Sequence, residues 1–513
     1  DSGVGLPPAQ RERAKAISTE ITGLSQAFRR RIREDKTRLA FTQAELKGVP
    51  APVCQPPPGD AKGRYLLGLD YPTLTPVLEN AVDPRTRERM RGAFLRLGGT
   101  ENLAVLQQLG DLRREYAALF GFDSYADFVL RRRMAQSEAE VQRFLATVKD
   151  AVERRELDDL ALLREAKARH LKQPVEKTTL QRSDVAFYSE RIRRARFAVD
   201  QERFRPYFPP QASLDTVFAL ATRLFGVNFK PLQQALWHAD ARAFAVSDGT
   251  SGELLGTLFV DLYPRDDKYN HAAVWTLRNV STLAERRPAA ARVVNFDRRG
   301  LTLDEFETLL HEFGHALHAL LSKTRHAGQG GTSVQTDFVE APSQMLEDWV
   351  YRPEVLALMQ QVCKACKPVP KDLLAQAERA RHFGKGYQYA RQHLFARYDL
   401  AFHGRTREAP LALWKRMEAE TPLGHAEGSM FPAGFAHIAG GYAAGYYSYL
   451  WSQVLAEDLR TAFDGKRLDA ATGQRYRDTV LANGGQVAPA ELVQRFLGRP
   501  SDSRAFFEFL NTR

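Results

Sequence analysis

The sequence LLHEFGHALHALL, residues 309–321, places four ionisable side chains inside an otherwise apolar helical pattern, namely His311, Glu312, His315 and His318. Thr302 is expected to cap this helix, and Glu305 stands at the reciprocal position of a capping box. An apolar stripe follows at helical spacing, formed by Phe306, Leu310, Phe313, Leu317 and Leu320. His311 and His315 lie on another face, one turn apart and about 6 Å along the axis. The pattern predicts a core helix that presents two imidazoles together.

The spacing of the two histidines fits a metal ion. Imidazoles one turn apart can both reach a zinc ion at about 2.0 to 2.1 Å. Glu312 then lies beside the metal and can take a proton from a metal-bound water, which is the HExxH arrangement of zinc peptidases. A catalytic zinc also needs a third protein ligand and an open position. A chance HExxH on a core helix is the alternative unless the rest of the chain supplies that ligand.

The third histidine of the stretch does not supply it. His318 lies about 10 Å along the axis from His311, so the two cannot share one ion on a straight helix. The metzincin pattern would need glycine at position 318 and histidine at position 321, where this chain has His318 and Leu321. The metzincin arrangement is therefore excluded.

Acidic residues downstream offer the missing ligand. The segment VQTDFVEAPSQMLEDWV, residues 334–350, is helix-like and carries Asp337, Glu340 and Glu347. In the gluzincin arrangement the third ligand is a glutamate about 25 residues after the second histidine, on a helix packed against the first. Glu340 fits that spacing best, and Glu347 is the alternative.

Composition limits the other classes of function. A chain of 513 residues exceeds what one core usually organises, which predicts two domains or a two-lobed body. Its 44% hydrophobic and 26% charged residues are typical of soluble globular proteins, and no run approaches the roughly 20 apolar residues of a membrane span. The net charge is +11, but the basic residues are dispersed among acidic ones on helix faces. We therefore expect no nucleic-acid partner and no membrane partner.

The three cysteines, Cys54, Cys363 and Cys366, are too few for a disulfide scaffold. The CxxC pair at 363–366 can form a local disulfide or half of a metal site, but no second pair follows it. A surface turn before Pro368 is the preferred interpretation.

The remaining pattern is mostly helical. Amphipathic helices are expected from Pro7 to about Leu46 and again from about Asp83 to Ala198. Strand signals appear at residues 242–248 and 253–264, joined by a hairpin turn, and also at 272–277 and 291–296. This order predicts a helical N-terminal lobe over residues 1–240 and a catalytic lobe over residues 241–513.

Several segments together resemble the thimet oligopeptidase family of zinc metallopeptidases. They are HEFGHALH at 311–318, TDFVEAPSQMLEDW at 336–349, the strand region at 254–273, and FAHIAGGYAAGYYSYLWSQVLAEDL at 435–459. The resemblance extends from about Leu6 to the C-terminus. It implies a mainly α, two-lobed helical body with a deep central channel and a small β-sheet near the zinc site. It also implies a bacterial member that lacks the most N-terminal helices of longer relatives.

The resemblance assigns roles to individual residues. It makes His311, His315 and Glu340 the ligands of one zinc ion per chain, and Glu312 the general base. It implies that His437, Tyr442 and Tyr449 act on the substrate, and that Tyr446, Gly440 and Gly441 lie at the substrate site. The three tyrosines are spaced i, i+4 and i+7, which gives one helical face if the helix begins that early. His318 is expected either to support the metal ligands or to be structural, and not to act in catalysis; Asp304, Glu307 and Glu347 are all candidates for orienting the imidazoles.

The expected function is that of a metalloendopeptidase, a hydrolase that cleaves short unstructured peptides. A peptidyl-dipeptidase that releases C-terminal dipeptides is the close alternative. A non-enzymatic, zinc-stabilised or nucleic-acid-binding helical protein is the distant one. The protein is expected to be a cytoplasmic monomer, with a periplasmic or exported form as the alternative because the chain begins at Asp1 without an initiator methionine.

Overall fold

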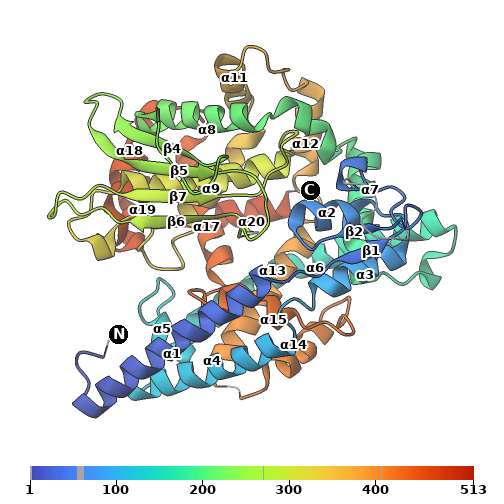
Figure 1. Ribbon diagram of the computed structural model, residues 1–513, viewed down its shortest axis with the longest axis horizontal. Helices are drawn as coiled ribbons and strands as arrows, with labels where there is room; N and C mark the ends of the chain where they lie inside the picture. The colour runs from blue at the N-terminus through green and yellow to red at the C-terminus, as the bar shows by residue number, and fades with distance from the viewer. Residues whose placement is uncertain (1–2, 55–62, 270, 406, 513) are drawn as a thin grey trace. The chain divides into compact units, whose positions relative to one another are not determined.

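The computed structural model describes residues 3–54, 63–269, 271–405 and 407–512, and it is mainly helical with a small mixed sheet, as predicted (Figure 1). The chain forms two compact units. The first contains Asp1–Arg196 and Phe383–Tyr447, and the second contains Phe197–His382 and Ser448–Arg513. This division differs from the expected boundary at residue 240, because the chain leaves each unit and later returns to it. Among the described residues, no helix is both long and apolar enough to cross a membrane.

The first unit is built on long antiparallel helices, with α1 against α4 and α6 against α13. The helix predicted up to Leu46 ends earlier, because residues 39–41 pair with residues 65–67 as a two-stranded sheet and bury Phe41. The described elements are α1 (Pro8–Arg33), β1 (Leu39–Phe41), β2 (Tyr65–Leu67), α2 (Tyr71–Asn80), α3 (Pro84–Phe94), α4 (Gly99–Leu119), α5 (Tyr125–Leu130), α6 (Glu138–Leu171), α7 (Val185–Ile192), α13 (Lys385–His403), α14 (Pro410–Ala419), α15 (Phe431–Gly434) and α16 (Ala436–Ala439).

The second unit combines a five-stranded sheet with helices. The strand order is β3-β4-β5-β7-β6, and every neighbouring pair is antiparallel except β5 with β7. The elements are α8 (Pro210–Phe225), β3 (Val227–Leu232), β4 (Arg242–Asp248), β5 (Leu254–Asp261), β6 (Ala273–Arg278), β7 (Ala289–Val293), α9 (Leu303–Leu321), α10 (Ala341–Glu347), α11 (Pro353–Val362), α12 (Lys371–Ala380), α17 (Ser448–Arg460), α18 (Ala470–Thr479), α19 (Pro489–Leu497) and α20 (Arg504–Asn511).

The sheet follows the sequence prediction with one omission. The expected hairpin is β4 and β5, and the other two strand signals overlap β6 and β7. Strand β3 was not expected. It lies at the edge of the sheet and contains Pro231, and proline argues against a strand even though an edge position tolerates it.

Helix α9 is the element that fixes the site. Its capping box is present: Glu305 N–H donates to Thr302 Oγ1 at 3.1 Å, and Thr302 N–H donates to Glu305 Oε2 at 2.8 Å. The helix packs against β5, β6 and β7 of the sheet and against α10. The whole predicted apolar stripe is buried, namely Phe306, Leu310, Phe313, Leu317 and Leu320. The sheet thus gives α9 a packed, rigid support.

The CxxC pair lies between α11 and α12. Cys363 and Cys366 are joined by a disulfide, so this pair supplies no metal ligands in the structure. The segment is at the surface, as predicted, but the disulfide is the alternative that the sequence analysis placed second.

Candidate metal centre

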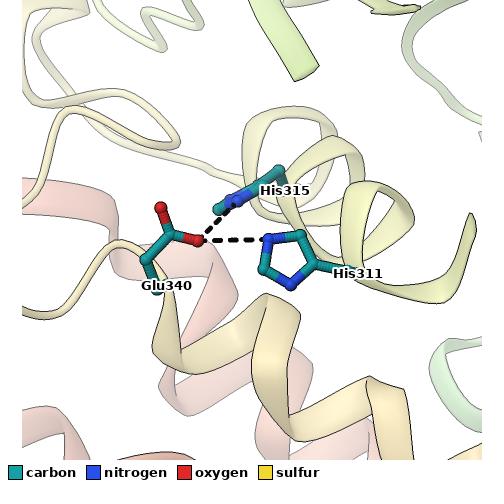
Figure 2. Close-up of side chains that lie close together, drawn as sticks. All are labelled: His311, His315 and Glu340. Carbon is teal, nitrogen blue, oxygen red and sulfur yellow. Dashed lines mark hydrogen bonds and ion pairs between the residues drawn. The ribbon is translucent and has the colours of Figure 1, made fainter. Parts of the chain in front are cut away.

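Two histidines of α9 and one glutamate converge at a single point. His315 Nε2 lies 3.0 Å and His311 Nε2 lies 3.2 Å from the same oxygen, Glu340 Oε2. Figure 2 shows both imidazoles pointing at that carboxylate oxygen. The ligand atoms of the three residues all lie within 4.8 Å of one another. Two imidazole nitrogens and one carboxylate oxygen are a donor set suited to zinc, because a catalytic zinc takes three protein ligands and leaves its fourth position to water or substrate.

Close helix packing brings the glutamate within reach. Glu340 immediately precedes α10, which packs on α9 beside Gly314. A β-carbon at Gly314 would lie 2.5 Å from Ser343 Cα and 2.8 Å from the Pro342 carbonyl oxygen. Only glycine allows this approach, since the atoms it would meet belong to the backbone. Gly314, which lies between His311 and His315, therefore allows Glu340 to come within reach of the two imidazoles.

A second carboxylate holds the far side of one imidazole. Glu347 Oε1 lies 2.7 Å from His311 Nδ1. A carboxylate only accepts, so Nδ1 carries the proton and Nε2 is the nitrogen left to bind a metal. Of the three candidates for this orienting role, Glu347 makes the contact. Glu307 instead accepts from the Tyr351 hydroxyl at 3.0 Å, and Asp304 accepts from Gln201.

Charge couples the members of the cluster. Burial acts to lower the pKa of His311, but hydrogen bonds with Glu340 and Glu347 outweigh it and hold that pKa well above its usual range. Burial acts to raise the pKa of Glu340, but the charge of His315 and hydrogen bonds from His311 and His315 hold it well below its usual range. A metal ion must compete with these protons, so metal affinity here depends on pH.

Glu312 lies next to the cluster but outside it. Its side chain is 6% exposed, and its Oε2 atom has no hydrogen-bond partner among the described residues. Burial raises the pKa of Glu312, an effect that the neighbouring charges of His311 and His315 oppose. A buried carboxylate oxygen without a partner costs stability unless another group completes it. This is the position a proton acceptor for an attacking water would need.

His318 lies apart from the cluster. Its ring is fully buried, neither ring nitrogen has a partner within the described part of the chain, and it packs edge-on against Phe338. Burial lowers the pKa of His318 to about 3, so the imidazole is neutral. The structure thus places His318 in the core and outside the metal cluster. The helix geometry predicts only that it cannot share an ion with His311.

The predicted substrate-side residues are divided between the two units. Tyr449 belongs to the second unit, near the start of α17, where its carbonyl accepts from Gln344 Nε2 of α10 at 3.1 Å. Ser452 Oγ of α17 donates to the Asp337 carbonyl at 2.7 Å, which links α17 to the chain just before Glu340 as well. The start of α17 is therefore tied to the same segment that supplies Glu340.

The other predicted residues belong to the first unit, in residues 436–447, which we call the glycine–tyrosine segment. Its rings gather around His437, with Tyr442 at 5.9 Å and Tyr446 at 5.4 Å between ring centroids. Tyr446 also packs against Phe435 and is buried. A β-carbon at Gly440 would overlap the Arg29 guanidinium, whereas one at Gly441 would meet nothing within 4 Å.

The helical face expected for the three tyrosines is wrong. Helix α17 begins only at Ser448, and the chain from 440 to 447 forms turns. Ala444 within them has a φ of 50°, which no α-helix contains. The spacing of Tyr442, Tyr446 and Tyr449 therefore does not bring them onto one face.

The candidate ligands and the candidate base were found from the sequence, but the residues that hold them in position were missed. Gly314 was visible as a small residue between two ligand candidates, and that was a usable signal. The contact of Gln344 with α17 and the buried groups behind the glycine–tyrosine segment have no local signal, since their partners lie far away in the chain.

The chain is similar to several known proteins over nearly its whole length. The model of the peptidase family M3 matches residues 77–512. Oligopeptidase A of Escherichia coli is 33% identical over 99% of this chain and 79% of its own length. Saccharolysin of Saccharomyces cerevisiae is 30% identical over 99% of this chain and 76% of its own length. In fold, the chain is similar to Pz peptidase A solved with an inhibitor, with a TM-score of 0.58, 15% identity, and coverage of 98% of this chain and 76% of that one.

Proposed function

The chain belongs to peptidase family M3 and is a metallopeptidase, and on that premise we propose that it is a zinc-dependent oligopeptidase that cleaves internal bonds of short, unstructured peptides. The observation that carries the proposal is the convergence of His311 Nε2, His315 Nε2 and Glu340 Oε2 on one point. The unpartnered Glu312 oxygen beside that point supports it.

The donor set and its surroundings fit zinc. Two imidazoles and a glutamate leave one position open for water, as catalytic zinc requires. When bound, zinc supplies a water of lowered pKa and polarises the peptide carbonyl. His311, His315 and Glu340 would hold the ion, and Glu347 would keep His311 in the tautomer that offers Nε2.

The remaining chemistry belongs to side chains of this protein. Glu312 takes the proton from the attacking water and later delivers it to the leaving amine, a role that its burial and raised pKa suit. Tyr449 donates a hydrogen bond to the oxyanion that develops on the substrate carbonyl. Tyr442 and His437 assist it, and Tyr446, Gly440 and Gly441 line the path of the peptide; these roles rest on the sequence resemblance.

The proposal is tested by hydrolysis of a short quenched fluorescent peptide by the purified chain. We expect activity to be lost with a chelator and restored by zinc, with one zinc ion per chain by elemental analysis. Glu312→Gln should lower kcat by about 10² to 10⁴ and leave the zinc content unchanged. The matched control is Glu307→Gln, on the same helix, which should cleave at the parent rate because Glu307 contacts Tyr351 instead.

Two outcomes would refute the proposal. One is a chain that binds no stoichiometric metal, and the other is a Glu312→Gln variant that cleaves as fast as the parent. A peptide blocked at its C-terminus separates the endopeptidase from the peptidyl-dipeptidase, because only an endopeptidase cuts it internally. Mass spectrometry of the products of blocked and free peptides gives the answer directly.

A further inference from the structure

Buried side chains of its own unit hold the glycine–tyrosine segment. One of them is Arg133, which donates to the Ala443 carbonyl at 3.2 Å and to the Ala444 carbonyl. Three others are also hydrogen-bonded to one another. They are Arg113 on α4, and Asp399 and His403 on α13, which are 2%, 1% and 1% exposed. None of them was singled out by the sequence, and none lies in the metal cluster. Their hydrogen bonds nevertheless go to the backbone of the segment that carries His437 and Tyr442.

Asp399 binds one side of the segment. Its Oδ2 accepts the backbone N–H of Gly445 at 2.7 Å and of Tyr446 at 2.8 Å, and its Oδ1 accepts that of Ala444 at 3.0 Å. Three consecutive N–H groups around one carboxylate form an anion-binding nest. The left-handed conformation of Ala444 belongs to this turn. Without the carboxylate, three buried donors would lack an acceptor, at a large cost in free energy.

Arg113 binds the other side. Its Nη1 donates to the Ile438 carbonyl at 2.7 Å, and its Nη2 donates to the Ala439 carbonyl at 3.0 Å. The Ser25 hydroxyl also donates to the Ala439 carbonyl, at 2.7 Å. The turn that contains Tyr442 therefore has its first carbonyls fixed by a cation and its last N–H groups fixed by an anion.

His403 joins the cation to the anion. Its Nε2 lies 2.9 Å from Arg113 Nη1, and its Nδ1 lies 2.8 Å from Asp399 Oδ1. A guanidinium only donates, so Nε2 accepts and the ring proton lies on Nδ1, where it is donated to Asp399. Burial lowers the pKa of His403, in keeping with a neutral ring. The three side chains thus form one continuous hydrogen-bonded path behind the segment.

We propose that Asp399, His403 and Arg113 are positioning residues for peptide hydrolysis, which fix the backbone on both sides of Tyr442 and so set where His437 and Tyr442 stand toward the substrate. This inference rests on the proposed function, in which those two side chains act on the substrate. Hydrogen-bond donors to an oxyanion act only in the correct geometry, and a displacement of about 1 Å can cost 10²-fold in rate. The hydrogen bonds that hold the turn go to its backbone atoms and not to the side chains of His437 and Tyr442.

The first test is Asp399→Asn in the full chain. An amide keeps the shape but cannot accept from three N–H groups and an imidazole, so the turn should shift. We expect kcat to fall by about 10- to 100-fold, while KM changes by less than about threefold. The matched control is Asp184→Asn. Asp184 is equally buried in the same unit, but it accepts from Arg87 and Lys167, outside the segment. It should lower the melting temperature and leave kcat unchanged.

A double-mutant cycle separates positioning from general destabilisation. If Asp399 acts through Tyr442, the effect of Asp399→Asn on kcat should shrink when Tyr442→Phe is already present. The inference would be overturned if the effects of Asp399→Asn and Tyr442→Phe on kcat simply multiplied in the double variant. Equal losses of kcat from Asp399→Asn and Asp184→Asn would overturn it as well. Should Asp399→Asn fail to fold, Arg113→Lys replaces it, because lysine keeps the charge but cannot span two carbonyls and an imidazole. A several-fold loss of kcat is expected, and the parent kcat would contradict the proposal.

The inference and the proposed function fail in different ways. If the function is wrong, the parent chain loaded with zinc cleaves no peptide. If only the inference is wrong, the parent cleaves and Asp399→Asn cleaves as fast.

Discussion

His311 Nδ1 lies 2.7 Å from Glu347 Oε1, on the edge of the ring opposite the Nε2 atom that faces Glu340. This contact fixes both the tautomer and the orientation of a ligand candidate. Glu347→Gln removes the charge that stabilises it, and groups of this kind are usually worth about 10- to 100-fold in metal affinity. We expect a loss of zinc affinity in that range, measured by competition with a chromophoric chelator. If Glu347→Gln bound zinc as tightly as the parent, the contact between Glu347 and His311 would not contribute to zinc affinity.

Gly314 gives a second prediction, on the packing of α10 against α9. Gly314→Ala would drive a methyl group into the backbone of Pro342 and Ser343, which cannot move cheaply. We expect a loss of about 1 to 3 kcal/mol in unfolding free energy and weaker zinc binding, because Glu340 moves with α10. Gly23→Ala is the control, since Gly23 is also helical and a β-carbon there meets nothing within 4 Å. That substitution should leave stability equal or raise it by up to about 1 kcal/mol.

His318 allows a test of its place outside the metal centre. Leucine is similar in bulk and removes two buried nitrogens that have no partner among the described residues. His318→Leu should therefore keep the zinc content and kcat of the parent, with an unfolding free energy equal to the parent's or higher by about 1 to 2 kcal/mol. His315→Leu, one turn earlier, should lose the metal. If the His318→Leu variant lost its zinc, His318 would have to be counted among the residues of the metal site.

Acid stability should depend on Asp348. Burial acts to raise the pKa of Asp348, but neighbouring guanidinium groups outweigh it and hold the pKa below its usual range; they belong to Arg460, Arg381 and Arg352. A carboxylate whose folded pKa is depressed stabilises the fold above its ordinary pKa of about 3.9, and this stabilisation is lost as pH falls toward the folded pKa. Asp348→Asn should cost about 3 kcal/mol at neutral pH and flatten the fall of stability below about pH 4.

Urea titrations at several pH values measure that dependence. The control is Asp464→Asn, because Asp464 is exposed and its pair with Arg467 should contribute little. An unchanged slope in Asp348→Asn would assign the acid sensitivity to other carboxylates.

The parts of the protein that could be predicted from the sequence are those with local signals. Helix α9 begins at its capping box, its apolar stripe is buried, and its two histidines meet at one point, all within 20 residues of chain. Glu340 required only one spacing rule, although it lies immediately before helix α10 and not on it. The general fold class follows equally from helical periodicity and a hairpin signal.

The parts that could not be predicted depend on distant partners. The turns at 440–447 read as helix because three tyrosines have helical spacing, but Asp399 and Arg113 bind the backbone in another conformation. Strand β3 was missed because Pro231 is tolerated only through its place at the sheet edge. The unit boundaries were not predicted, because residues 383–447 belong to the first unit and no change in composition marks where the chain returns to it.

The discontinuity of the second unit has a practical consequence for making smaller versions of the protein. His311, His315 and Glu340 lie in 197–382, but the residues that tie α17 to the Glu340 segment lie in 448–513. No single truncation therefore isolates the metal-binding body as an expressible fragment. A minimal version would need residues 383–447 excised and a new peptide linker from 382 to 448, or a circularly permuted gene.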